Sequence, residues 1–572
     1  MIRAPRRLTA FLVTAFAAIA FGATAAPLPK ATATGSYLAG QQALVDLRTV
    51  EAANFLEKAA KADWENPVIV ERAFMALAAD ARIEDAADMG KHLLELDPTN
   101  EFARLVIAVV ELKQRRYDAV VDELAGVGIE TYPGLAGTIL RGWGYVGAGK
   151  ADEADKSLRE VGEEGLADFL VFHRALMADV GGNHDLAISL ADEAYKTDSA
   201  VPRMVEAYAR ILGNAGRTDD AEKVIADFAK QGLSHPLVDI VKKALDDGKR
   251  PGLFAPTPQA GAAEMLYSLG VALSREPIGD YAAVLLRLGM YLDPDSHLIA
   301  LALAQLFDWH EQYKAANAIY DGIPSASPMK PLAVVRVAGN LDALGDRPEA
   351  IRQLTGIINA HPDDLEAVSV LGDLYRDDEK FAEAADAYTK ALAITGGETP
   401  ADWRFYYVRG IAYERNKEWP KAEADFQKAL VLNPDQPDVL NYLGYSWVDQ
   451  GIHLEPALAM IEKAVAAAPN NGYIVDSLGW AFYRMGRFDE AVKTLEQAVQ
   501  LLPNDPEIND HLGDAYWRVG RSLEAHFQWN VAYAMDDKGS VKARVMPKLA
   551  NGLESIGVAG EPEAPAPQAS AQ

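Results

Sequence analysis

The residue types that perform chemistry occur in this chain without forming a catalytic or metal-binding pattern. No cysteine occurs among its 572 residues, which excludes disulfide bonds, thiolate metal ligands, cysteine nucleophiles and lipid attachment to a cysteine. The ten histidines are scattered, and no two of them lie four residues apart around a glutamate, as a zinc-binding helix requires. The many carboxylates are explained by solvated helix faces.

Two short motifs match active-site loops only as strings of letters. Residues 142–147 read Gly-Trp-Gly-Tyr-Val-Gly, the glycine spacing of a dinucleotide-binding loop, but such a loop must follow a strand and this segment lies inside a predicted helix. Residues 444–447 read Gly-Tyr-Ser-Trp and lack the second glycine of a nucleophile elbow. We therefore predict no catalytic residue, no metal site, no small-molecule cofactor and no enzymatic activity.

The elements that carry these residues follow an internal repeat. Alanines recur about every 34 residues from Ala52 to Ala525, with one longer step in the middle of the chain. A small residue often lies twelve positions before such an alanine, and a proline twelve positions after it, as in the set Gly479, Ala491 and Pro503. Small residues let two helices approach closely, and proline ends the second helix. The spacing predicts helical hairpins.

These columns resemble the tetratricopeptide-repeat (TPR) consensus over nearly the whole mature chain. The resemblance implies an all-α fold, a TPR solenoid in which helical hairpins stack as a right-handed superhelix in two sub-arrays. The segments that we expect are a signal peptide (1–25), a degenerate sub-array of about six repeats (26–235), a junction helix with a Gly/Pro-rich linker (236–262), a clearer sub-array of about eight repeats (263–539), a capping helix (540–557) and a disordered tail (558–572).

The first 25 residues have the pattern of an export signal. Three arginines precede an uncharged apolar run from Leu8 to Phe21, and Ala23-Thr24-Ala25 is a cleavage sequence. The run is shorter than the roughly 20 residues that span a membrane, although an uncleaved N-terminal anchor is the alternative. We expect an exported, periplasmic protein that is not lipidated and that associates with the envelope through its partners.

The charge balance restricts the partners. The chain has 83 acidic and 55 basic residues, for a formal charge of −28. Such a chain repels nucleic-acid phosphates, so we expect no nucleic-acid partner, and it favours proteins with basic patches.

A candidate binding surface follows from the hairpin geometry. The first helix of a TPR hairpin lines the concave groove, and its groove positions here combine aromatic, polar and cationic side chains, which suits a protein- or peptide-binding surface. Asn441, Asp476 and Asp510 share one repeat position and should form a polar row that bonds an extended backbone. Ordinary groove solvation with packing between repeats explains the same residues equally well. The candidates are Tyr407, Asn441, Tyr445, Asp476, Trp480, Tyr483, Asp510, Trp517 and Arg518.

Residues 440–521 carry a more specific resemblance. They include the stretches LNYLGYSWVDQG, GYIVDSLGWAFYRMGRFDEAVKTLEQAV and DPEINDHLGDAYWRVGR. This segment resembles a family of exported bacterial repeat proteins that includes the lipoprotein partner of a carboxyl-terminal processing protease. The resemblance implies an adaptor that assembles or activates such a protease and presents substrates such as cell-wall hydrolases to it.

One feature departs from that family. Its members are anchored through a lipidated cysteine, and this chain has none. A soluble periplasmic adaptor and a different partner are both consistent with this difference. Because TPR motifs also occur in exopolysaccharide-export and pilus-assembly factors, an assembly scaffold for polysaccharide or surface-structure export is the alternative function.

Overall fold

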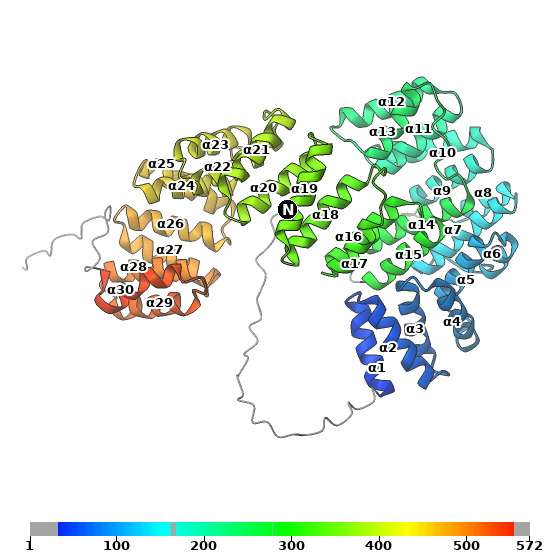
Figure 1. Ribbon diagram of the computed structural model, residues 1–572, viewed down its shortest axis with the longest axis horizontal. Coiled ribbons are helices and arrows are strands. Elements are labelled where there is room, and N and C mark those ends of the chain that lie inside the picture. The colour runs from blue at the N-terminus through cyan, green and yellow to red at the C-terminus, as the bar shows by residue number, and fades with distance from the viewer. Residues whose placement is uncertain (1–31, 162–166, 277, 554–572) are drawn as a thin grey trace, which may run out of the picture. The chain divides into compact units, whose positions relative to one another are not determined.

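The computed structural model describes residues 32–161, 167–276 and 278–553, and these residues form helices joined by short turns (Figure 1). The expected all-α solenoid of hairpins is confirmed, and no strand occurs in the described ranges. None of the described helices is both long and apolar enough to cross a membrane. The predicted signal peptide (1–25) and tail (558–572) lie outside the described residues.

The helix bounds are α1 Ala33–Val45, α2 Thr49–Ala62, α3 Pro67–Ala79, α4 Ile83–Leu96, α5 Glu101–Lys113, α6 Tyr117–Glu123, α7 Tyr132–Gly147, α8 Ala151–Arg159, α9 Ala167–Val180, α10 His184–Thr197, α11 Pro202–Asn214, α12 Thr218–Lys230, α13 Pro236–Asp246, α14 Pro258–Leu273, α15 Gly279–Leu292, α16 His297–Trp309, α17 Tyr313–Asp321, α18 Lys330–Ala343, α19 Arg347–Ala360, α20 Leu365–Asp377, α21 Phe381–Thr395, the 3₁₀ turn η1 Pro400–Asp402, α22 Trp403–Arg415, α23 Trp419–Leu432, α24 Pro437–Gln450, α25 Leu454–Ala467, α26 Gly472–Arg484, α27 Phe488–Leu501, α28 Pro506–Arg518, α29 Ser522–Met535 and α30 Ser540–Asn551.

Local sequence determines where these helices begin and end. Asn471 and Asp505 cap α26 and α28 by accepting hydrogen bonds from backbone N–H groups of the first turn. The turns after these two helices place Gly486 and Gly520 at φ 75° and 78°, in the left-handed region that glycine adopts without strain. The hairpins α26–α27 and α28–α29 therefore each have a start and a turn that the local sequence specifies.

The small-residue column marks where the two helices of a hairpin cross. A Cβ atom at Gly479 would lie 2.5 Å from Cγ of Leu495 on the second helix, closer than side-chain atoms can approach. At Gly513 a Cβ atom would lie 2.4 Å from Cδ1 of Trp529. The close helix contact predicted from these glycines is present.

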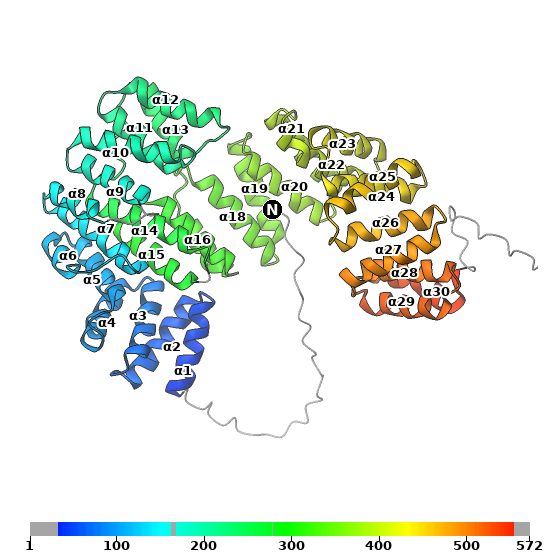
Figure 2. The same ribbon diagram turned by 180° about the vertical axis from the view of Figure 1, so that it is seen from behind.

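The chain forms two compact units, Met1–Ile319 and Tyr320–Gln572. This boundary differs from the expected junction at 236–262. The junction helix (α13) and the non-helical linker after it are present. They do not end the first unit, because α14 and α15 turn back and pack on α3, α5, α7 and α9, the first helices of the preceding hairpins (Figures 1 and 2).

Specific contacts hold α14 and α15 in the first unit. Gly261 lies so close to Trp143 that a Cβ atom would be 2.1 Å from the indole ring. The side-chain amide of Gln259 donates to the carbonyl of Leu112 at 2.8 Å. Phe102 and Tyr281 stack with their ring centroids 5.4 Å apart. The chain thus fills much of the first-helix side of its own first unit.

The linker before α14 is held on the same side. Arg210 donates to the carbonyl of Pro251, and the backbone N–H of Gly252 donates to the side-chain oxygen of Asn214 at 3.1 Å. The guanidinium of Arg203 lies 4.1 Å from the centre of the Phe254 ring. A Gly/Pro-rich segment that looks like a boundary in the sequence is therefore an ordered strap within one unit.

Candidate protein-binding surface

The nine candidate residues lie on α22, α24, α26 and α28, the first helices of four successive hairpins in the second unit. The next repeat position after Asp510 is Arg544, 34 residues later on α30, and Lys548 lies 34 residues after Asp514. The capping helix α30 therefore continues the register of the first helices. It packs on α28 and α29.

A stacked cluster joins α26 to α28. The His511 ring bonds both carboxylate oxygens of Asp476 at 3.0 Å, and it stacks on Trp480 with centroids 4.1 Å apart. Trp480 in turn stacks on Tyr483 at 4.6 Å. Burial alone lowers the pKa of His511, but the charges of Asp476 and Glu507 outweigh burial and raise the pKa to about 8. The imidazole is therefore a cation at neutral pH and neutralises Asp476.

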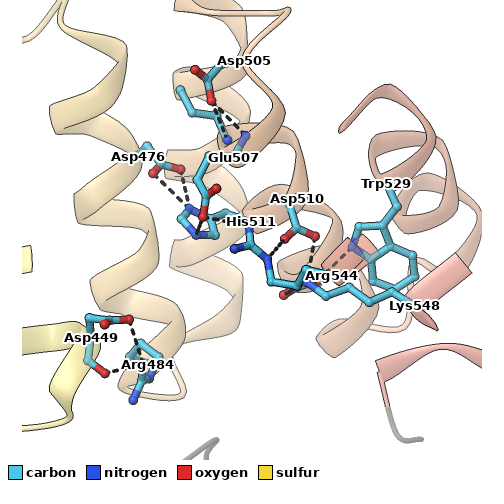
Figure 3. A network of polar contacts seen from close by, with 12 residues as sticks. Asp449, Asp476, Arg484, Asp505, Glu507, Asp510, His511, Trp529, Arg544 and Lys548 are labelled. Carbon is cyan, nitrogen blue, oxygen red and sulfur yellow. Dashed lines mark hydrogen bonds and ion pairs between the residues drawn. The ribbon is translucent and has the colours of Figure 1, made fainter. Parts of the chain in front are cut away.

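A second buried network joins α28 to the capping helix (Figure 3). The ammonium of Lys548 donates to Asp510 at 2.7 Å and to both oxygens of Asp514 at 2.7 and 2.8 Å. Arg544 donates to Asp510 at 2.6 Å and to Glu507 at 2.8 Å. Burial and the neighbouring Asp510 carboxylate raise the pKa of Asp514 to about 6.

These contacts correct the expected polar row. The side chains of Asp476 and Asp510 are 9% and 1% exposed, and both are engaged by residues of the next helix. They therefore serve packing between repeats and do not face the groove as free acceptors. Asn441 differs from them, because its Oδ1 atom is buried and has no hydrogen-bond partner among the described residues.

Three more candidates are also committed to packing. Tyr483 is fully buried, and its hydroxyl accepts a hydrogen bond from Arg518 at 3.2 Å. Trp517 lies against Trp529, with centroids 5.5 Å apart. It also contacts the end of α30, where a Cβ atom at Gly552 would lie 2.2 Å from the Trp517 ring.

The remaining four candidates form a partly exposed surface that we call the aromatic face: Tyr407, Asn441, Tyr445 and Trp480. Trp480 Nε1 is buried without a hydrogen-bond partner among the described residues, as is Asn441 Oδ1. Each such group costs about 1–3 kcal/mol. Trp480 Nε1 is a donor and Asn441 Oδ1 is an acceptor, and they lie on neighbouring first helices. A peptide backbone offers the matching acceptor and donor, and it can bind both atoms once small side-chain rotations uncover them.

The residues that form the two networks around Asp476 and Asp510 were not identified from the sequence: Glu507, His511, Asp514, Arg544 and Lys548. A signal for two of them existed, since Arg544 and Lys548 follow two aspartates by one repeat length. Opposite charges at equal repeat positions predict a contact between adjacent first helices.

The first unit has its own cleft of about 730 Å³ between the starts of α5 and α7. Its volume is typical of ligand sites. No lysine, arginine or histidine is among the described residues that line it. In the described ranges, no group of His, Asp and Glu side chains is arranged to hold a metal ion. The acidic and aromatic lining residues are Glu71, Asp97, Glu101, Glu130, Phe102, Tyr132 and Tyr281.

The hairpins and their spacing define a helical-repeat protein, and sequence comparison identifies the repeat. Tetratricopeptide repeat models match residues 340–399 and 403–436, and a TPR repeat model matches 479–520. The chain therefore carries tetratricopeptide repeats, which bind other proteins. Matches of this kind do not distinguish a protease adaptor from other TPR proteins, and the absence of enzymatic activity stays a prediction.

Individual relatives match only short segments. A TPR repeat-containing protein of Pseudomonas aeruginosa is 32% identical over 92 residues, which are 16% of this chain and 16% of that protein. A protein O-mannosyl-transferase of Homo sapiens is 24% identical over 167 residues, 29% of this chain and 19% of that protein. The chain thus spans less than a fifth of either relative. The crystal structure of MamA is 26% identical with a TM-score of 0.27, covering 29% of this chain and 95% of that one.

Proposed function

We propose that this protein is a periplasmic scaffold or adaptor that binds a segment of a partner protein on the aromatic face of its second unit. The observation that carries the proposal is the contrast within the candidate set. Asp476 and Asp510 are buried and neutralised by residues of the next helix. Tyr407, Asn441, Tyr445 and Trp480 are partly exposed, and Asn441 Oδ1 and Trp480 Nε1 have no hydrogen-bond partner among the described residues, although Trp480 also stacks on Tyr483 and His511. Partly exposed aromatic anchors with polar groups are typical of binding hot spots.

The packing of the first unit supports placing the binding surface on the second unit. Much of the first-helix side of the first unit is covered by α14, α15 and the strap at Pro251 and Gly252, so an incoming segment competes there with the chain itself. The acidic cleft beside α5 and the formal charge of −28 favour partners with basic segments.

For the partner, we propose an envelope processing protease whose substrates the adaptor presents. The support is the resemblance of residues 440–521 to protease adaptors, together with the export-signal pattern of residues 1–25. An assembly scaffold for polysaccharide or surface-structure export is the alternative, because TPRs occur in both settings.

Affinity capture from the envelope extract of the source cells tests this proposal. Residues 26–572 and the variant Trp480→Ala serve as parallel baits, with Val431→Ala as a control for an exposed apolar residue on the second helix α23. We expect a protease whose capture falls at least tenfold with Trp480→Ala and is unchanged with Val431→Ala. Export machinery captured in the same pattern supports the alternative. If the Trp480→Ala variant captures as much partner as the unsubstituted chain and its circular dichroism spectrum is unchanged, the aromatic face is refuted as the binding surface.

A further inference from the structure

The capping helix α30 leaves open a side that the preceding hairpins cover. In α24, α26 and α28 a glycine at one repeat position touches the second helix of the same hairpin. A Cβ atom at Gly444, Gly479 or Gly513 would lie within 2.4–2.8 Å of a side chain there. The same position in α30 is Pro547, which is exposed. Nothing in the described part of the chain covers it.

Neighbouring positions show the same change. Leu512 of α28 is 1% exposed under its second helix, whereas Met546, one repeat later, is 58% exposed. Tyr516 is buried, and its counterpart Ala550 is exposed. We call this side of α30 the outer face: Ala543, Met546, Pro547 and Ala550. A terminal helix normally presents polar residues here for solubility, so an apolar outer face indicates a missing partner.

The repeat itself specifies that partner as an α-helix. Shifted by 34 residues, α29 would recur at residues 556–569, a stretch whose sequence contains Pro562, Pro565 and Pro567. Each proline in a helix interior costs about 3 kcal/mol. A covering helix supplied by another molecule avoids this cost.

Charge favours an acidic helix. Lys538 and Lys542 lie near the outer face, and the ammonium of Lys542 lies 5.6 Å from the centre of the exposed Tyr533 ring, whereas the Arg544 guanidinium is engaged by Asp510 and Glu507. This basic region belongs to a chain with a formal charge of −28. The same face of a second copy would bring like charges together, whereas an acidic helix is attracted.

We propose that the outer face of α30 binds an acidic amphipathic α-helix of a partner protein, which takes the place of the second helix of a further hairpin. Pro547 is bulkier than the glycine of the other hairpins, so the partner helix must present a small residue opposite it. The surface is separate from the aromatic face and does not depend on the proposed function there.

A peptide based on the chain's own second helix tests the proposal. The probe is residues 486–503 with Leu495→Ala, fluorescein-labelled and lactam-stapled. It contains α27 with a small residue in place of Leu495, the side chain that meets Gly479, and it has three acidic and two basic side chains. With the full chain we expect a saturable rise in anisotropy. Met546→Asp should weaken binding at least tenfold, since it places a like charge in an apolar contact. The control Leu344→Asp, at another exposed apolar residue of the second unit, should bind normally.

Three results overturn the proposal: no binding of the peptide, equal binding by Met546→Asp, or a dimer in light scattering that Met546→Asp dissociates. The last result would assign the outer face to a second copy. Trp480→Ala should leave peptide binding unchanged, so failure at the outer face and failure at the aromatic face are distinguishable. Because Met546 is exposed, the helix content of Met546→Asp measured by circular dichroism should equal that of the unsubstituted chain.

Discussion

Replacing Lys548 with methionine should loosen the C-terminal end of the array. The Lys548 side chain is 6% exposed and neutralises Asp510 and Asp514, which are 1% and 5% exposed. Methionine keeps most of the side-chain volume but leaves two buried carboxylates without the ammonium. Breaking a buried ion pair from one side costs about 3–5 kcal/mol. Arg544 still neutralises Asp510 and Trp529 still donates to Asp514, so we expect about 3 kcal/mol.

Hydrogen exchange read by mass spectrometry measures this change locally. A long repeat array does not unfold in one step, so a single melting temperature would average over both units. A loss of about 3 kcal/mol corresponds to roughly 150-fold faster exchange of amides in α30 and the adjoining turns of α28. Peptides from the first unit should not change.

The chain offers a matched control and a rescue. Lys542→Met makes the same substitution on the same helix, where the ammonium only lies over Tyr533 and contributes about 0.5–1 kcal/mol. Adding Asp514→Asn to Lys548→Met removes one of the two buried carboxylates that have lost the ammonium. The double variant should therefore recover part of the protection of α30 against hydrogen exchange. Equal exchange in Lys548→Met and Lys542→Met would refute the buried network as the element that fastens α30.

Further predictions concern the hairpin crossing and the buried histidine. Gly479→Ala should destabilise the α26–α27 hairpin by about 1–3 kcal/mol, because its Cβ meets Leu495, and hydrogen exchange in these two helices should rise accordingly. Gly339→Ala has open space and should stabilise α18 by up to about 1 kcal/mol in the same measurement. The pKa of His511 is raised from 6.5 to about 8, so its stabilisation is full below pH 6.5 and is lost as pH rises through about 8. Rate-corrected hydrogen exchange in α26 and α28 should therefore increase from pH 6 to pH 9, and Asp476→Asn should abolish most of that dependence.

The hairpins could be predicted from the repeat in the sequence, but the boundary between the two compact units could not. The glycine and alanine columns report contacts between helices that are neighbours in the chain, and Gly479 meets Leu495 as expected. The packing of α14 on α7 joins residues more than a hundred positions apart, and no short-range pattern records it. The Gly/Pro-rich linker has the composition of a boundary although Arg210 fastens it to the first unit.

The candidate site divides in the same way. The repeat register placed Asn441, Asp476 and Asp510 at one position of successive helices, and the helices lie where that register predicts. Whether each polar group is open depends on the residue that the next helix brings to it, which is His511 for Asp476 and Lys548 for Asp510. The expectation of an open row was therefore wrong at both aspartates.

The sequence by itself determined the helices and their pairing, because these depend on side-chain size and polarity at a fixed spacing. The tertiary structure decided which groove residues stay available, because burial and charge pairing depend on contacts between successive first helices and with α30. The outer face of α30 shows the same division. Its repeat position can be read from the sequence, but its exposure follows from the absence of a covering helix in the described part of the chain.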